Sequence, residues 1–195
     1  MNPYDNIVLA SASPRRQDLM KMIGLDFTVH ASDFDEKENE LPAEEIALHN
    51  AIGKAHDVAK HYRNSLIIGA DTVVSFQHHI LGKPKSDEDA KEKLRLLSNT
   101  THQVMTALCM IDTNKMQPVT ALVTTDVTID RLEEKDIEIY VNSGEGHDKA
   151  AGYAIQGLGS LFIKEIKGDY FNVVGLPIYT LRKMLEKFNL KYFYG

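Results

Sequence analysis

The segment SASPRR, from Ser11 to Arg16, places two hydroxyl and two guanidinium groups directly after an apolar run. Ser13 is a preferred N-cap residue, and Pro14 suits the first turn of a helix, where its missing N–H costs nothing. The unpaired N–H groups of a helix N-terminus attract phosphate, and Ser11, Arg15 and Arg16 would add further donors. The segment therefore predicts an anion site, although a capped helix with two solvated arginines fits the same residues.

A second group of residues surrounds Asp71, an acidic residue inside the apolar segment GADTVV. If the strand bends at Gly69, Asp71 would lie beyond a strand end, where open α/β sheets bind their ligands. A carboxylate in such a run has to be paired, hydrogen-bonded or bound to a metal, because burying it alone is very costly. A structural salt bridge meets this requirement as well as a catalytic role does.

Two lysines are candidate cationic partners for this carboxylate. Lys54 lies among alanine and valine residues on the apolar face of a predicted helix, and Lys83 belongs to the segment LGKPKS. A lysine on an apolar face either extends its ammonium group to solvent or meets an anionic ligand. The presence of Asp71 gives weight to the second explanation.

The segment DKAAGYAIQGLG, residues 148–159, is rich in small residues and contains Gln156. Glycines at this density allow either tight turns or a close approach of the backbone to a ligand. The segment lacks the third glycine of the dinucleotide fingerprint, and the chain contains neither a Walker A motif nor a GxSxG elbow. Dinucleotide-binding, P-loop and serine-hydrolase functions therefore have no motif to support them.

Alternating strands and helices have to position these residues. Strand-forming patterns cover residues 6–10, 27–31, 66–70 continuing into 72–76, 104–111, 119–129 and 161–166. Helical periodicity and end signals cover residues 14–23, 43–62, 87–97, 133–142 and 177–188. Ser86 is placed to cap the third of these helices, and the two longest strands are expected to pair as an antiparallel hairpin. The fold class is α/β, with a mixed, twisted sheet flanked by helices.

Composition limits the broad class of the protein. The chain has 195 residues, of which 43% are hydrophobic, and this predicts one domain over residues 1–195. A net charge of -6 argues against a broad basic surface that binds nucleic acid. The apolar runs are too short for a membrane span, and no secretory leader is visible. The single cysteine, Cys109, lies in an apolar segment, which predicts a core position and a reducing, cytoplasmic setting.

Taken together, these motifs resemble the Maf family of nucleotide pyrophosphatases. The resemblance extends from SASPRR at residue 11 to the segment NVVGLP that ends at residue 177, and it includes the pair Asp35 and Glu36. It implies a mixed α/β fold similar to that of the inosine triphosphate pyrophosphatases, with two lobes around a cleft. The implied reaction converts a nucleoside triphosphate to its monophosphate and pyrophosphate, with a divalent metal cation, Mg²⁺ or Mn²⁺.

Within this family, GADTVV together with YAIQG resembles the branch that acts on dTTP and UTP. The branch that acts on methylated guanosine triphosphate typically has a serine and a glutamine around the corresponding aspartate, where this chain has Ala70 and Thr72. The resemblance makes Asp71 the proton acceptor. It assigns base selection to Arg15, Thr72 and Gln156. It assigns phosphate and metal binding to Ser11, Arg16, Glu36, Lys54 and Lys83, with Ser13 in the same substrate-binding turn.

The chemistry of the reaction agrees with these assignments. Magnesium usually binds through one or two carboxylates plus substrate phosphates, and Glu36 and Asp71 could supply the carboxylates. Lys54, Lys83 and Arg16 would neutralise the negative charge that develops in phosphoryl transfer. These residues leave open whether Asp71 acts as the base, as a metal ligand or as both.

The two arginines are expected to differ in role, because neighbouring helical positions do not share a face. We expect the turn, Ser11 and Arg16 to hold the phosphates, while Arg15 reaches the base side of the cleft. The amide of Gln156 can pair with the N3–H and a carbonyl group of uracil or thymine, but the flipped amide suits cytosine equally well.

An alternative function is a nucleotide-binding regulatory module in cell-division control, which the family resemblance also prompts. A pure binder needs the cations but not Asp71 together with Glu36, so these residues favour an enzyme with a nucleoside triphosphate substrate. The aromatic tail at residues 191–194 is expected to provide packing or a homodimer contact.

Overall fold

The computed structural model describes residues 3–38 and 41–190 of the chain. Its strands are β1 (Asn6–Leu9), β2 (Thr28–Val29), β3 (Ser65–Phe76), β4 (His79–Ile80), β5 (Thr101–Asp112), β6 (Pro118–Ile129) and β7 (Ile163–Lys167). Its α-helices are α1 (Pro14–Met22), α2 (Ala43–Ala59), α3 (Asp87–Leu97), α4 (Glu134–Asn142), α5 (Tyr170–Val174) and α6 (Ile178–Lys187). The 3₁₀ helices η1 (Ala150–Gly152) and η2 (Gly157–Phe162) lie between α4 and β7.

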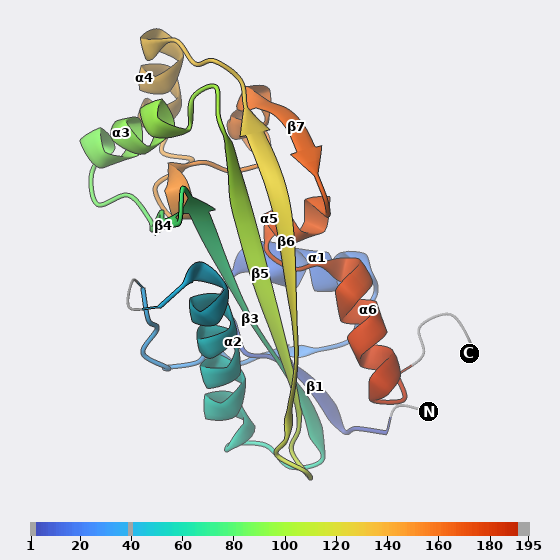
Figure 1. Cartoon of the computed structure of the whole chain (residues 1–195). Helices are drawn as coiled ribbons and strands as arrows, with labels where there is room; N and C mark the ends of the chain where they lie inside the picture. Colours follow the sequence, from blue (N-terminus) through green and yellow to red (C-terminus); the bar gives the residue numbers. More distant parts are fainter. Residues whose placement is uncertain (1–2, 39–40, 191–195) are drawn as a thin grey trace.

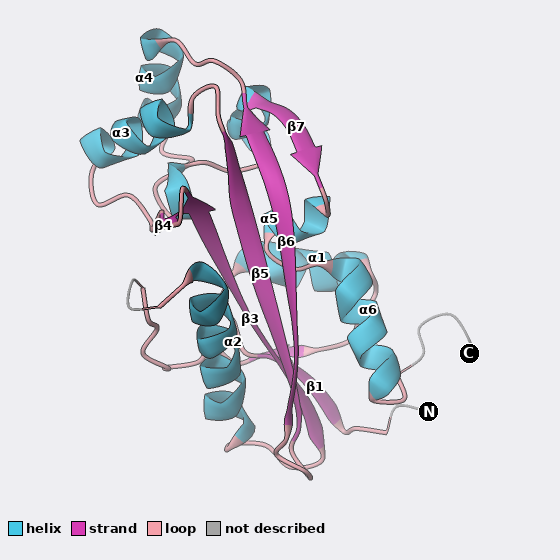
Figure 2. Ribbon diagram, in the orientation of Figure 1, coloured by secondary structure: helices cyan, strands magenta, loops and turns pink. Residues whose placement is uncertain are grey.

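The strands form one mixed sheet in the order β2-β1-β3-β5-β6-β7, with β4 paired to β3. β1 is parallel to β2 and β3, whereas β3, β5, β6 and β7 pair in antiparallel fashion. The strands β3, β5 and β6 run side by side along the length of the molecule, and helices flank them (Figure 1, Figure 2). The predicted α/β fold with a mixed sheet is therefore confirmed, as is the hairpin of β5 and β6.

Helices cover both faces of the sheet and its far end. Helix α2 packs on one face of β3 and β5, while α1 and α6 pack on the opposite face. Helices α3 and α4 pack at the end of the long strands that lies away from β1 (Figure 1). Cys109 lies in the core beneath α2, as predicted, and burial raises the pKa of its thiol to about 12.

Helix α2 presents a stripe of small side chains to the sheet. Alanine occupies every fourth position, and each of these alanines is buried: Ala43, Ala47, Ala51, Ala55 and Ala59. Residues four apart share one helix face, so the methyl groups let the helix backbone come close to β3. A Cβ atom on Gly69 of β3 would lie 2.4 Å from the backbone oxygen of Ala51.

The strand does not bend at Gly69. Strand β3 pairs with β5 without a register shift from Leu66 to Ser75, so it passes straight through the glycine. The physical reason for glycine at this position is the close approach of α2, which leaves no room for a side chain. Asp71 therefore lies within β3 and not beyond the end of its own strand.

The edge of β3 that faces β1 is open around Asp71. β1 ends at Leu9, opposite Ile68, and β4 pairs with β3 at Ser75 and Phe76. No other strand among residues 3–38 and 41–190 pairs with this edge between those points. The aspartate thus lies beyond the carboxyl end of β1, the parallel neighbour of its own strand.

The ends of several elements differ from their predicted bounds. Ser86 caps α3 by accepting a hydrogen bond from the backbone N–H of Asp89, as predicted, but the side chain of Ser13 does not cap α1. Helix α5 has no counterpart among the predicted elements, because five residues are too few to show helical periodicity. Residues 161 and 162 belong to η2, so β7 begins later than predicted.

No helix in the described part of the chain is both long and apolar enough to cross a membrane. The aromatic tail at residues 191–194, where the sequence suggests packing or a dimer contact, lies outside the described residues.

Substitution of Gly69 by alanine tests the close packing of α2 on β3. The added methyl group would meet backbone atoms of α2, so we expect Gly69→Ala to lower the free energy of unfolding by roughly 1–3 kcal/mol. Urea denaturation followed by circular dichroism measures the change. Gly82→Ala is the matched control, because nothing lies within 4 Å of its new methyl group, and we expect a change within about 0.5 kcal/mol. Equal effects of the two substitutions would contradict this account of Gly69.

Candidate active site

A pocket of about 580 Å³ lies at the open edge of β3. Its walls come from the turn after β1, from α2, from the loop before η2 and from the end of α5. Every residue that the sequence predicts for the site lines this pocket. These are Ser11, Ser13, Arg15, Arg16, Glu36, Lys54, Asp71, Thr72, Lys83 and Gln156.

An ammonium group between two carboxylates forms the most polar part of the pocket. The Nζ atom of Lys54 lies 2.7 Å from Oδ1 of Asp71 and 2.9 Å from Oε2 of Glu36. Lys54 and Asp71 are buried, whereas the side chain of Glu36 is half exposed. Lys54 therefore does not extend to solvent, and the buried charge of Asp71 has the partner that its burial requires.

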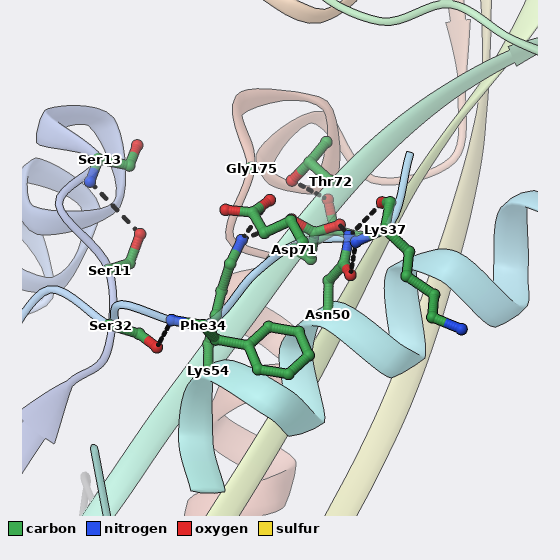
Figure 3. A network of polar contacts seen from close by, with 12 residues as sticks. Ser11, Ser13, Ser32, Phe34, Lys37, Asn50, Lys54, Asp71, Thr72 and Gly175 are labelled. Carbon is green, nitrogen blue, oxygen red and sulfur yellow. Dashed lines mark hydrogen bonds and ion pairs between the residues drawn. The ribbon is translucent and has the colours of Figure 1, made fainter. Parts of the chain in front are cut away.

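The buried residue Asn50 completes the surroundings of Asp71. Its Nδ2 atom donates to Oδ2 of Asp71 over 3.2 Å, so both carboxylate oxygens of the aspartate are bonded (Figure 3). Sequence reasoning missed Asn50. The usable signal was its position four residues before Lys54, which places both side chains on one face of α2.

Arg16 is buried and fastens the turn after β1 to two other elements. Its Nε atom donates to the carbonyl of Gly175 over 2.9 Å, and its Nη atoms donate to Ser11 over 2.9 Å and to Thr72 over 3.0 Å. Burial lowers the pKa of Arg16, while the nearby carboxylates of Asp71 and Glu36 act in the opposite direction. This guanidinium group brings positive charge to the pocket from a fixed position.

Hydrogen bonds fix the direction in which the Thr72 hydroxyl points. Thr106 lies 2.9 Å from both the carbonyl of Asn172 and the hydroxyl of Thr72, and it has one proton to donate. Because a carbonyl can only accept, Thr106 donates to Asn172, and Thr72 must donate to Thr106. Thr72 also accepts from Arg16, so it offers only a lone pair to a molecule in the pocket.

The remaining predicted residues lie nearer to solvent. Arg15 is half buried, and burial lowers its pKa against the opposing effect of Asp148. Lys83 and Gln156 are exposed at the pocket wall. The predicted side-chain cap at Ser13 is wrong, since its hydroxyl accepts no capping hydrogen bond; the backbone N–H of Ser13 donates to the hydroxyl of Ser11 over 3.3 Å (Figure 3). The two arginines therefore differ in burial, as expected of residues that do not share a helix face.

Two anchors that the sequence did not reveal hold the loop that carries Gln156. The carboxylate of Glu145 accepts from the backbone N–H groups of Leu158 and Gly159, each over 2.9 Å. The hydroxyl of Tyr153 lies 2.6 Å from Nε2 of His102, which is buried in β5. These contacts fix the loop on either side of Gln156.

The family of the chain follows from comparison with known proteins. Residues 6–188 match the family model described as Maf-like protein. The chain belongs to the Maf family. This confirms the resemblance seen in the sequence motifs.

Several curated relatives of this Maf-family chain are named dTTP/UTP pyrophosphatase. The protein from Ruminiclostridium cellulolyticum is 46% identical over 95% of this chain and 97% of its own length. The protein from Methanosarcina barkeri is 43% identical over 96% of both chains. The protein from Clostridioides difficile is 42% identical over 97% of this chain and 99% of its own length.

A solved structure shares the fold of this Maf-family chain. The Ham1 protein of Staphylococcus aureus superposes with a TM-score of 0.51 over 93% of this chain and 98% of its own, at 23% sequence identity. The likeness supports the α/β fold of the chain and concerns the fold alone.

The carboxylates of the pocket suit a divalent cation whose remaining ligands come from the substrate. No group of three or more His, Cys, Asp and Glu side chains that could hold a metal occurs within residues 3–38 and 41–190. Glu36 and Asp71 do share one ammonium group, so they already lie within reach of a single positive charge. Magnesium needs few protein ligands when phosphate oxygens and water supply the rest. The pair of carboxylates therefore fits a metal bound together with a nucleotide.

The substitution Arg16→Lys tests the anchoring role of the guanidinium group. Lysine cannot reach Gly175, Ser11 and Thr72 together, so buried acceptors lose their donors. We expect the free energy of unfolding to fall by roughly 2–4 kcal/mol. Chemical denaturation measures it, and the neighbouring Arg15→Lys serves as control with a change within about 0.5 kcal/mol. An equal loss in both variants would show that Arg16 is not the anchor.

Acid should weaken the protein through His102. Burial lowers the pKa of His102 to about 4 from its ordinary value of 6.5. Between these pH values the unfolded chain binds a proton at His102 that the folded chain does not bind. The contribution of His102 to stability is therefore complete above pH 6.5 and is lost as the pH falls toward 4. The loss attributable to His102 should reach about 3 kcal/mol.

This pH dependence can be measured by urea denaturation at pH 7 and pH 4. The variant His102→Gln removes the titrating group, so its stability should fall less than that of the wild type between the two pH values. The same fall in both proteins would remove His102 as the cause.

Proposed function

We propose that this protein hydrolyses dTTP and UTP to the nucleoside monophosphate and pyrophosphate. The observation that carries the proposal is the cluster of the buried residues Asp71 and Lys54 with the half-exposed Glu36, in a pocket at the open edge of β3. Relatives that are 42–46% identical over nearly the whole chain and are named dTTP/UTP pyrophosphatase support the choice of substrate. We also propose that residues 1–195 form a single two-lobed domain and that the protein acts in the cytoplasm. That the protein forms a homodimer stays a prediction.

Water has to be activated for attack at the α-phosphorus, and Asp71 is the proposed proton acceptor. Its carboxylate is held at both oxygens, by Lys54 and by Asn50, so it keeps one orientation in the pocket. Glu36 and Asp71 are the proposed ligands of a divalent cation, Mg²⁺ or Mn²⁺. When bound, such a cation supplies Lewis-acid stabilisation of phosphate oxygens and lowers the pKa of a bound water.

Three cations of the chain face the phosphates in this proposal. Lys54 and Arg16 are buried and held in place, so their charges need no reorganisation during the reaction. Lys83 is exposed at the wall of the pocket and can approach a bound triphosphate. Together they offset the negative charge that develops on the pyrophosphate leaving group.

Base selection is proposed to rest on Thr72, Gln156 and Arg15. Because Thr72 offers only a lone pair, it favours a donor such as the N3–H of uracil or thymine over the bare N3 of cytosine. Gln156 is exposed, and its amide makes no hydrogen bond within the described part of the chain, so it can turn toward a bound base. This orientation of Thr72 favours the pyrimidines that carry an N3 proton.

The alternative is a nucleotide-binding regulatory module in cell-division control. Such a module would need the cations of the pocket but would gain nothing from two carboxylates beside the phosphates, which repel a triphosphate. The Asp71 and Glu36 pair therefore favours catalysis.

Pyrophosphate release from dTTP and UTP, with Mg²⁺ or Mn²⁺, tests the proposal. Asp71→Asn keeps the shape of the side chain but removes its basicity, so we expect kcat to fall by about 10²–10⁴-fold. The exposed Asp136→Asn on α4 is the matched control and should keep wild-type activity. CTP and purine triphosphates in the same assay measure base selection.

The outcomes of this assay separate the alternatives. Wild type that binds dTTP without releasing pyrophosphate would refute the enzyme and favour the regulatory module. Full activity of folded Asp71→Asn would instead refute the assignment of Asp71 as base.

A further inference from the structure

Asn50 makes three hydrogen bonds, which link Asp71 to the backbone of Lys37. The side chain is 2% exposed and lies on α2 one turn before Lys54. Its Nδ2 atom donates to Oδ2 of Asp71 over 3.2 Å and to the backbone carbonyl of Lys37 over 2.9 Å. Its Oδ1 atom accepts from the backbone N–H of Lys37 over 2.9 Å (Figure 3).

These bonds use the full donor capacity of the amide and fix its orientation. An asparagine side chain has two N–H donors and one carbonyl acceptor, and each is engaged. A flipped amide would turn its oxygen toward the carboxylate of Asp71 and its nitrogen toward the N–H of Lys37, so only one orientation is satisfied. Asn50 does not line the pocket, and any effect on the reaction passes through its partners.

Residues 32–37, here called the strap, carry Glu36 to the pocket without helix or strand structure of their own. Besides the ion pair of Glu36 with Lys54, the strap attaches to α2 at three points. Ser32 donates to Asp57 over 2.8 Å, the ring of Phe34 lies against Gly53, and the backbone of Lys37 pairs with Asn50. Positions 50, 53 and 57 recur at helical spacing, so the strap runs antiparallel along one face of α2.

Of these three attachments, the last also reaches the centre of the site, where Lys54 bonds both carboxylates directly. Asp57 and Gly53 hold the strap to the helix but have no bond to Asp71, whereas Asn50 bonds Asp71 and the residue next to Glu36. The amide is also neutral, so it adds no third negative charge beside the two carboxylates. A carboxylate at position 50 would lack both donors and would repel Asp71.

We propose that Asn50 is a positioning residue that, together with the ammonium group of Lys54, sets the distance between the carboxylates of Glu36 and Asp71, because one amide group holds both the strap and the aspartate. This inference rests on the proposed pyrophosphatase function, in which these carboxylates act together. Outer partners of ligating and catalytic groups typically contribute 10–100-fold to metal affinity or activity. The expected effect is on turnover, since Asn50 does not touch the pocket.

The test is a double-mutant cycle measured as pyrophosphate release from dTTP. Asn50→Leu keeps the size of the side chain and removes the three hydrogen bonds, so kcat should fall about 10–100-fold. The KM for dTTP should change less than about threefold, because Asn50 makes no contact with the pocket. In the Glu36→Gln background, the same substitution should lower kcat less than about threefold further, because the coupling to Glu36 is already lost.

Hydrogen exchange gives a readout that does not depend on activity. The backbone N–H of Lys37 donates to Asn50, so Asn50→Leu should speed exchange in the strap by about tenfold or more, while β3 stays protected. Asp57→Ala is the control, because it removes the oxygen that accepts from the hydroxyl of Ser32 and from the backbone N–H of Asp33 without touching Asp71. It should speed exchange near Ser32 and lower kcat less than Asn50→Leu does.

Each outcome bears on the proposal. Equal losses from Asn50→Leu in the wild-type and Glu36→Gln backgrounds would show a general structural role and would overturn it, as would unchanged exchange in the strap. An equal loss of kcat in Asp57→Ala would also overturn it. If Asn50→Leu fails to fold, Asn50→Ala and Asn50→Asp carry the same cycle. Absence of activity in the wild type would refute the proposed function, whereas active wild type with active Asn50→Leu would refute this inference alone.

Discussion

The carboxyl side chain of Asp71, buried in the middle of β3, is the constraint on which the rest of the site depends. A carboxylate at this depth is tolerated only with partners at both oxygens. Lys54 and Asn50 supply them from consecutive turns of α2, so the helix has to lie close to the strand. The alanine stripe of α2 and the bare backbone of Gly69 permit this approach. The packing of α2 on Gly69 and the bonds of Asp71 to Lys54 and Asn50 therefore require the same short distance between α2 and β3.

Much of the fold could be predicted because its elements have strong local patterns. The long strands β3, β5 and β6 consist largely of β-branched and apolar residues, and the ends of α3 carry recognisable capping chemistry. Gly69 shows where local reasoning fails, because a glycine in a strand has the same sequence appearance whether it bends the chain or accommodates a neighbour. Only the tertiary position of α2 distinguishes the two cases. The short helix α5 likewise depends on hydrogen bonds to β5, which lies too far away in the sequence for local patterns to reveal them.

The site residues that were easiest to predict from the sequence are charged residues that interrupt an apolar pattern. Lys54 and Asp71 are noticeable because each interrupts an apolar pattern, and the structure joins them directly. Asn50, Glu145 and His102 gave no such sign, since a polar residue on a helix or a loop has many ordinary explanations. Their contacts are formed across 13, 14 and 51 positions of the chain, respectively. Residues that hold other residues in place are thus harder to read from sequence than residues that carry unusual charge.

The open stretch of β3 between β1 and β4 has a consequence for solubility. An unpaired strand edge is a template on which another chain can add a strand, and natural proteins protect such edges with charged side chains. Asp71 and Thr72 lie in this stretch, with the ammonium of Lys54 and the guanidinium of Arg16 against them. A second strand docking there would have to bury these charges without water. The groups that make the pocket chemically capable therefore also keep the open edge of β3 from joining two molecules together.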